Sequence, residues 1–202
     1  MNPLSGVLDF LVRMIPGAVL AGLVYLALCP VRKHRLARAG QSSGTLRECA
    51  MLVLFLFCGA LTVLVLTPRW FHWATLLTEG AGEAVYFQLG SVNWVPFRTF
   101  LFDSWSLMIL LGNVIMFLPI GFFICLLWRG STCGRAIAVG FAVTLFIECG
   151  QLLVGRSFDV DDLLLNTLGV LLGHLLCRIL CRRNMELVAR FRVTSTEMRD
   201  TS

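Results

Sequence analysis

Long apolar blocks separated by short polar connections dominate the sequence. Five blocks have about the 20 apolar residues that an α-helix needs to cross the hydrocarbon core of a bilayer. They cover approximately residues 11–30, 49–67, 107–128, 136–154 and 163–181. Pro16 and Pro119 lie inside two of these blocks, where neighbouring membrane helices can satisfy the carbonyls that proline frees. The pattern predicts an all-α fold, a polytopic transmembrane helical bundle with about five spans.

Composition excludes a soluble globular domain. Hydrophobic residues make up 57% of the chain and charged residues only 14%, so no water-facing surface could absorb the apolar excess. The net charge of +5 does not indicate nucleic-acid binding, because the basic residues lie between the apolar blocks. We expect a membrane lipid or a lipid-linked amphiphile as partner, and no nucleic acid.

The basic residues also predict an orientation. Of the 17 Lys and Arg residues, 13 lie in segments 31–49, 129–135 and 178–202. Cytoplasmic loops carry such an excess, so the N-terminus is predicted outside and the C-terminus in the cytoplasm, in a bacterial inner membrane. We divide the chain into an N-terminal span with a basic loop (1–49), a membrane domain (50–181) and a basic cytoplasmic tail (182–202).

Eight cysteines do not form an evident disulfide or metal pattern. Most lie towards the predicted cytoplasmic side, where thiols stay reduced. Cys177 and Cys181 are one helical turn apart, but no His or second Cys pair accompanies them at zinc spacing. We therefore expect packing residues, no metal site and no cofactor; the lone His174 is interpreted as a packing residue rather than a proton relay.

Polar side chains gather near the predicted outer ends of the last three spans. They comprise three amides, four carboxylates and one guanidinium: Asn113, Gln151, Asn166, Glu148, Asp159, Asp161, Asp162 and Arg156. Helical spacing places Glu148 and Gln151 on one face, and Asp162 and Asn166 on another. At about 1.5 Å per residue, all of them fall within about 10 Å of the outer surface.

Two interpretations of these residues compete. In the first, they satisfy one another: Asp161 or Asp162 caps the last span, and Glu148 pairs with Arg156. In the second, they line a polar pocket that opens to the outer leaflet, with Arg156 available for a phosphate or carboxylate. Because polar groups inside a membrane are costly, we favour the pocket.

Small residues predict where helices approach closely. Gly169 and Gly173 form a small-xxx-small pair on the fifth span, and Pro119 with Gly121 predicts a bend in the third. The glycine face is also compatible with a homodimer. The aromatic segment 68–106 suits either an interfacial or re-entrant segment or a loop packed on the helix ends.

Several motifs resemble VanZ-like membrane proteins. These motifs are residues 93–97 (NWVPF), 112–121 (GNVIMFLPIG), 148–151 (ECGQ), 155–162 (GRSFDVDD) and 166–169 (NTLG). The resemblance covers about residues 50–180 and implies a multi-span cell-envelope protein. The family's namesake is linked to resistance against teicoplanin, an acylated glycopeptide antibiotic. The resemblance adds Asn93 to the site and includes the residues above except Asp161.

Three functions follow as hypotheses. The first is a binder whose polar pocket receives a lipid-anchored glycopeptide or wall precursor. The second is a membrane enzyme acting on an envelope lipid or glycan, with Glu148 as general acid and Asp159 or Asp161 as partner. The third is a transport or scaffold subunit. We favour the binder, because the sequence has no recognised nucleophile motif and no internal inverted repeat.

Overall fold

The computed structural model describes residues 3–66, 90–96 and 106–195. Its helices are α1 (Pro3–Arg38), α2 (Thr45–Leu66), α5 (Ser106–Leu127), α6 (Cys133–Leu153), α7 (Val160–Arg183) and the short α8 (Met185–Ala189). All five long helices contain a segment long and apolar enough to cross a membrane. The predicted all-α bundle with five spans is therefore confirmed.

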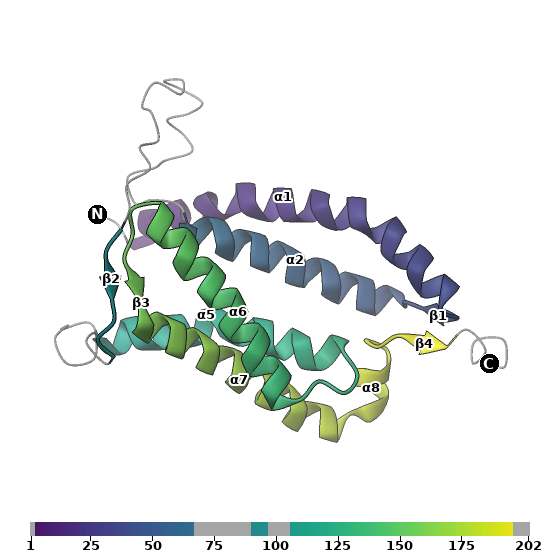
Figure 1. Ribbon diagram of the computed structural model, residues 1–202. Helices are drawn as coiled ribbons and strands as arrows, with labels where there is room; N and C mark the ends of the chain where they lie inside the picture. The colour runs from purple at the N-terminus through teal and green to yellow at the C-terminus, as the bar shows by residue number, and fades with distance from the viewer. Residues whose placement is uncertain (1–2, 67–89, 97–105, 196–202) are drawn as a thin grey trace.

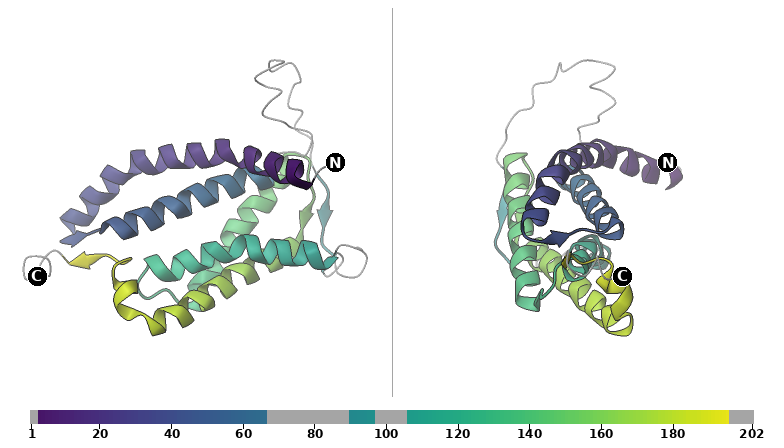
Figure 2. Two further views of the ribbon diagram at one scale, coloured as in Figure 1. Left: turned by 180° about the vertical axis from the view of Figure 1, so that it is seen from behind. Right: turned by 90° about the vertical axis from the view of Figure 1, so that its right-hand side faces the viewer.

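The long helices form two side-by-side pairs (Figures 1 and 2). Helix α1 packs along α2, and α5 packs along α7. Helix α6 crosses the bundle obliquely and packs mainly against α7. As a result, α2 and α6 end where α5 and α7 begin, and we call this end of the bundle the polar end.

The first helix is longer than its apolar block. We predicted a span over 11–30, but α1 continues to Arg38 and contains both Pro16 and Pro30. Hydropathy marks only the part suited to hydrocarbon, whereas residues 31–38 are rich in Arg, Lys, Leu and Ala, which favour helix in water as well. The basic connection to α2 is correspondingly short.

The start of α7 also differs from the prediction. The helix begins at Val160 rather than Leu163, and its N-cap is Asp159, whose side chain accepts a hydrogen bond from the Asp161 backbone N–H. The expectation that Asp161 or Asp162 caps this helix is wrong. Both lie inside the first turn, where negative charge is favoured by the helix dipole.

Two short strand pairs tie distant parts of the chain together at opposite ends of the bundle (Figure 1). At the polar end, β2 (Val92–Asn93) pairs in parallel with β3 (Phe158–Asp159). At the other end, β1 (Gln41–Ser42) pairs antiparallel with β4 (Thr194–Ser195). Apart from residues 90–96 and Ser106, the aromatic segment 68–106 lies outside the described residues.

Close backbone contact holds α5 against α7. A Cβ atom added at Gly121, Gly169 or Gly173 would collide with backbone atoms of the facing helix. The buried core beside this contact joins four helices through Leu61, Phe117, Ile120, Ala136, Ile147 and Val170. Many large apolar side chains remain exposed, for example Phe146 at 70% and Leu23 at 60%, as expected for surfaces that face lipid.

Candidate functional site

The turn between α6 and α7 forms the centre of the polar end. It is made possible by Gly155, whose φ of 78° is favourable for glycine and strained for most other residues. Backbone hydrogen bonds fold the turn onto the end of α6, including Arg156 N–H to the Gln151 carbonyl at 2.9 Å. The turn thereby brings Arg156 and Asp159 back beside the last turn of α6.

Glu148 is the most deeply buried acid of this end. Its side chain is 1% exposed, and its carboxylate accepts a hydrogen bond from the Asp159 backbone N–H at 3.0 Å. A carboxylate so placed anchors the start of α7 to α6. The buried carboxylate that the sequence predicts on α6 therefore contacts the α6–α7 turn directly.

Asn93 joins this centre through β2. Its side-chain amide donates to the Asp159 carboxylate at 3.0 Å, next to the β2–β3 pairing. Ser91 and Ser157 hydrogen-bond to each other at 2.8 Å, and the Trp94 ring packs against the Phe158 ring at a tilt of 40°, with ring centroids 5.7 Å apart. Residues 90–96 therefore pack against the turn that precedes α7.

Three more hydrogen bonds attach α5 and α2 to the polar end. Asn113 of α5 donates a hydrogen bond to the Asp162 carboxylate of α7. Gln151 and Arg156 both donate to the backbone carbonyl of Val65, at 3.1 and 2.7 Å. Val65 lies in the last turn of α2, where carbonyls lack partners within the helix. An apolar residue gives no sequence signal for this role.

The two remaining predicted residues, Asp161 and Asn166, are buried on α7. Asp161 is 4% exposed and sits in the first turn of α7, and Asn166 is 4% exposed one turn further along. The Oδ1 atom of Asn166 is buried and has no hydrogen-bond partner in the described part of the chain. The same holds for both ring nitrogens of His174, near the middle of α7. Buried polar atoms without a partner are costly, so they mark places where a further group could bind.

Eight of the nine predicted site residues therefore take part in the hydrogen bonds of the polar end, whereas Asn166 lies four residues beyond Asp162 on α7. Contacts link α6 to the start of α7, α5 to α7, β2 to β3, and α2 to the α6–α7 turn. Four of the nine side chains are carboxylates and one is a guanidinium. This excess of acceptors is suited to binding hydroxyl and ammonium groups.

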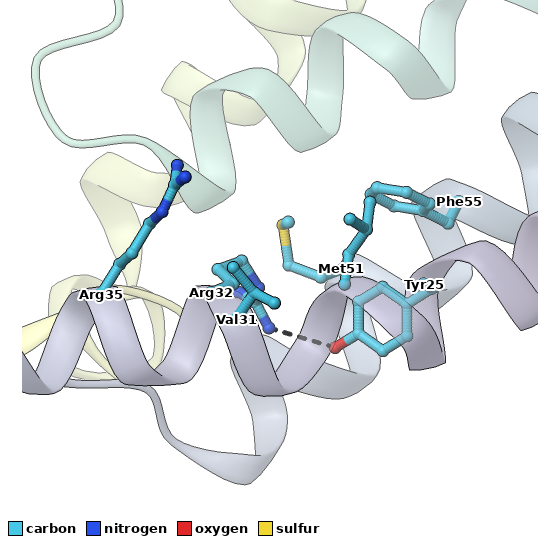
Figure 3. A pocket seen from close by; sticks show the side chains of 7 residues that line it. Tyr25, Val31, Arg32, Arg35, Met51 and Phe55 are labelled. Atoms are coloured by element: carbon cyan, nitrogen blue, oxygen red, sulfur yellow. Dashed lines mark hydrogen bonds between the residues drawn. The ribbon is translucent and has the colours of Figure 1, made fainter.

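A separate pocket lies towards the opposite end of α1 and α2 (Figure 3). It has a volume of about 270 Å³ and is lined by Tyr25, Leu28, Val31, Arg32, Arg35, Met51 and Phe55. Beside it, Glu48 pairs with Arg32 and accepts a hydrogen bond of 2.7 Å from the Tyr25 hydroxyl. Glu48 is 17 residues from Val65 along α2, or about 25 Å. This pocket is thus distinct from the predicted site.

Comparison with known proteins places the chain in a family. No curated protein and no solved structure matches it significantly. A family model described as VanZ/LLP1 matches residues 52–181, which include α5, α6, most of α2, nearly all of α7 and every residue of the polar end described above. The five-span helical bundle is therefore a multi-pass membrane protein that belongs to the VanZ/LLP1 family.

Proposed function

We propose that the polar end binds the polar portion of a lipid-anchored amphiphile, while the acyl chain of that ligand stays in the surrounding lipid. The observation that carries this proposal is the convergence of polar groups from four separate helices and β2, with an amide oxygen on Asn166 that has no partner among the described residues. Capping a helix or closing a turn requires far fewer buried polar groups than this.

The chemistry of the site favours a ligand with hydroxyl or amino groups. An ionised carboxylate has about four acceptor positions. One donor contacts Glu148 and two contact Asp159 in the described part of the chain, so both can accept more hydrogen bonds. A sugar or an amine would supply those donors, and Arg156 would bind a carboxylate or phosphate of the same ligand. An acylated glycopeptide and a lipid-linked wall precursor both combine such groups with an apolar chain.

The surroundings of the site fit a ligand that arrives through lipid. Large apolar side chains are exposed on the helices that form the polar end, such as Leu153 at 54% on α6 and Ile115 at 61% on α5. An acyl chain lying against them would stay in a hydrocarbon environment. The charge distribution predicts that this end faces outward, where an outer-leaflet amphiphile of a bacterial inner membrane would be accessible.

The test compares teicoplanin with its deacylated form in cells that produce the full chain. We expect protection against teicoplanin, and Glu148→Gln should reduce it about 10- to 100-fold, since a hydrogen bond to a charged group contributes about 1.5–3 kcal/mol. Gln keeps an acceptor for the Asp159 N–H, so the α6–α7 turn should persist. The matched control is Cys149→Ala, because Cys149 is the next residue on α6 and is exposed.

Binding by the purified protein provides the second measurement. Teicoplanin should raise the melting temperature of the wild type and of Cys149→Ala, and should leave that of Glu148→Gln unchanged. Two results together would contradict the assignment of the polar end as the binding site. Cells with Glu148→Gln would be protected as well as cells with the wild type, and teicoplanin would raise the melting temperature of this variant as much as that of the wild type. Equal binding of the deacylated form would contradict a requirement for the lipid anchor.

A membrane enzyme is a second candidate, favoured by the nearly complete burial of Glu148 beside Asp159. A buried carboxyl group next to a second carboxylate is an arrangement used in acid–base catalysis. The purified protein would then change at least one species in an envelope lipid extract, and Glu148→Gln would abolish the change. An unaltered lipid profile with the wild type would exclude this function for the lipids present.

A further inference from the structure

Three cysteines from two helices meet at the end of the bundle opposite the polar end. Cys125 comes from the last turns of α5, and Cys177 and Cys181 come from the last turns of α7. Their three Sγ atoms all lie within 4.8 Å of one another, and those of Cys177 and Cys181 are 3.4 Å apart. Cys125 is 6% exposed and Cys177 is fully buried, whereas Cys181 is half-buried. A ligand could therefore reach the cluster past Cys181.

The spacing of the sulfurs suits a shared metal ion better than a disulfide within α7. Metal–thiolate bonds are about 2.3 Å long, which puts three sulfurs around one ion about 4 Å apart. The observed separations need only small side-chain rotations to reach this value. A disulfide between Cys177 and Cys181 would instead need Cβ atoms about 3.5–4.5 Å apart, whereas residues four apart in a helix have theirs at about 5–6 Å.

The ligand type selects the metal. Thiolates are soft ligands that favour Cu(I), Zn and iron–sulfur clusters, and among the described residues no imidazole or carboxylate joins the three sulfurs. Structural zinc sites take four protein ligands, whereas this group offers three. Cu(I) shares the preference for sulfur, so three thiolates alone favour it over zinc.

The charge of the surroundings supports bound thiolates. Binding requires each thiol to lose its proton as its sulfur forms a bond to the metal. Three thiolates around a monovalent cation carry a net charge of −2, with three protons released to solvent. Arg192 interacts electrostatically with Cys125, and its Nε atom is buried without a hydrogen-bond partner in the described residues. The negative charge of a metal–thiolate centre would be favoured by this neighbouring cation.

From this geometry we propose that Cys125, Cys177 and Cys181 form a three-thiolate binding site for a soft monovalent metal ion of the Cu(I) class. The site lies about 15 residues, or roughly 22 Å, along α7 from Asp162. It is therefore independent of the proposed binding of an amphiphile. Only the fold brings Cys125 to the other two, which is why the spacing of cysteines in the sequence predicts no metal site.

The test titrates the reduced, detergent-purified full chain with Cu(I) in competition with a chromogenic Cu(I) chelator. The wild type should withdraw one equivalent per chain, and the triple serine variant of the three cysteines should withdraw none. Cys125→Ser alone should lower the affinity at least about tenfold, since even supporting residues of metal sites contribute that much. Cys149→Ser, which removes an exposed thiol on α6, should behave as the wild type.

A labelling measurement on the wild type covers the case in which a serine variant does not fold. Cu(I) should protect Cys181 from alkylation by iodoacetamide, read by mass spectrometry, and leave the exposed Cys149 reactive. Cys181 labelled equally with and without Cu(I) would overturn the proposal. Three other results would also overturn the proposal. The wild type would compete with the chelator for Cu(I) no better than the triple variant, Cys125→Ser would bind Cu(I) as tightly as the wild type, or the wild type would bind Zn(II) more tightly than Cu(I).

Discussion

Substitution of Gly121 by Ala tests how closely α5 and α7 must approach. A Cβ atom at this position would lie 2.6 Å from the carbonyl carbon of Val170 and 2.8 Å from the backbone nitrogen of His174, and nearer still to the Val170 oxygen. Non-bonded carbon atoms normally lie about 3.5–4.0 Å apart. The obstacles are backbone atoms rather than flexible side-chain ends, and the Val170 oxygen is the nearest, so the two helices must separate by about 1.5 Å.

That separation has consequences along the whole helix pair. Gly169 and Gly173 face Val114 and Leu118 just as closely, and Asn113 is hydrogen-bonded to Asp162 at the polar end. Overpacking of a well-packed contact costs about 1–3 kcal/mol. For a chain of this size, each kcal/mol lowers the melting temperature by about 2–4 °C. We therefore expect Gly121→Ala to melt about 2–12 °C below the wild type.

The matched control lies on the same helix. Gly112 has open space around it in the described part of the chain, with no atom within 4 Å of an added Cβ. Gly112→Ala should be neutral or stabilising, because Ala favours a helix over Gly by about 0.5–1 kcal/mol. Both variants are melted in one detergent with tryptophan fluorescence as the signal. Close backbone packing at Gly121 would be refuted if Gly121→Ala melted at the same temperature as the wild type. It would also be refuted if Gly112→Ala lowered the melting temperature as much as Gly121→Ala does.

Three further predictions concern single contacts. Glu48→Ala should destabilise the fold by about 1–3 kcal/mol, because it leaves the part-buried Arg32 without its carboxylate; a melting temperature equal to the wild type would contradict a structural role for this ion pair. The free energies of unfolding of Asn113→Ala, Asp162→Ala and the double variant, measured with denaturant, should give a coupling energy of about 1.5–3 kcal/mol. If the two single changes in unfolding free energy simply add in the double variant, the two residues do not interact. Gly155→Ala should lower stability by about 1–2 kcal/mol because its φ is 78°, and Gly155→Asn, which tolerates this conformation better, should recover part of the loss.

The fold follows largely from properties that are visible along the chain. Apolar stretches of membrane-spanning length identify five helices, and their approximate positions agree with the structure. Their ends do not, because hydropathy reports where hydrocarbon is favourable and not where the backbone stops being helical. Hence α1 extends eight residues past Pro30, and α7 begins three residues before Leu163.

Part of the polar end could be predicted because the cost of placing polar side chains in hydrocarbon can also be read residue by residue along the chain. Ionisable and amide side chains are rare within spans, so Glu148, Gln151 and Asn166 are conspicuous in the sequence. Their partners are not conspicuous, since Gln151 and Arg156 contact a backbone carbonyl of Val65, 86 and 91 residues away. Such contacts depend on where α2 ends relative to α6.

By itself, the sequence determines a membrane-spanning helical bundle with costly polar groups towards one end, because burial in hydrocarbon acts on each segment separately. Only the tertiary structure decides which groups meet: Asp159 as helix cap and partner of Asn93, Val65 as acceptor for two side chains, and Cys125 beside Cys177 and Cys181. These contacts join segments far apart in the chain. They depend on the relative placement of whole helices, which periodicity within one segment does not encode.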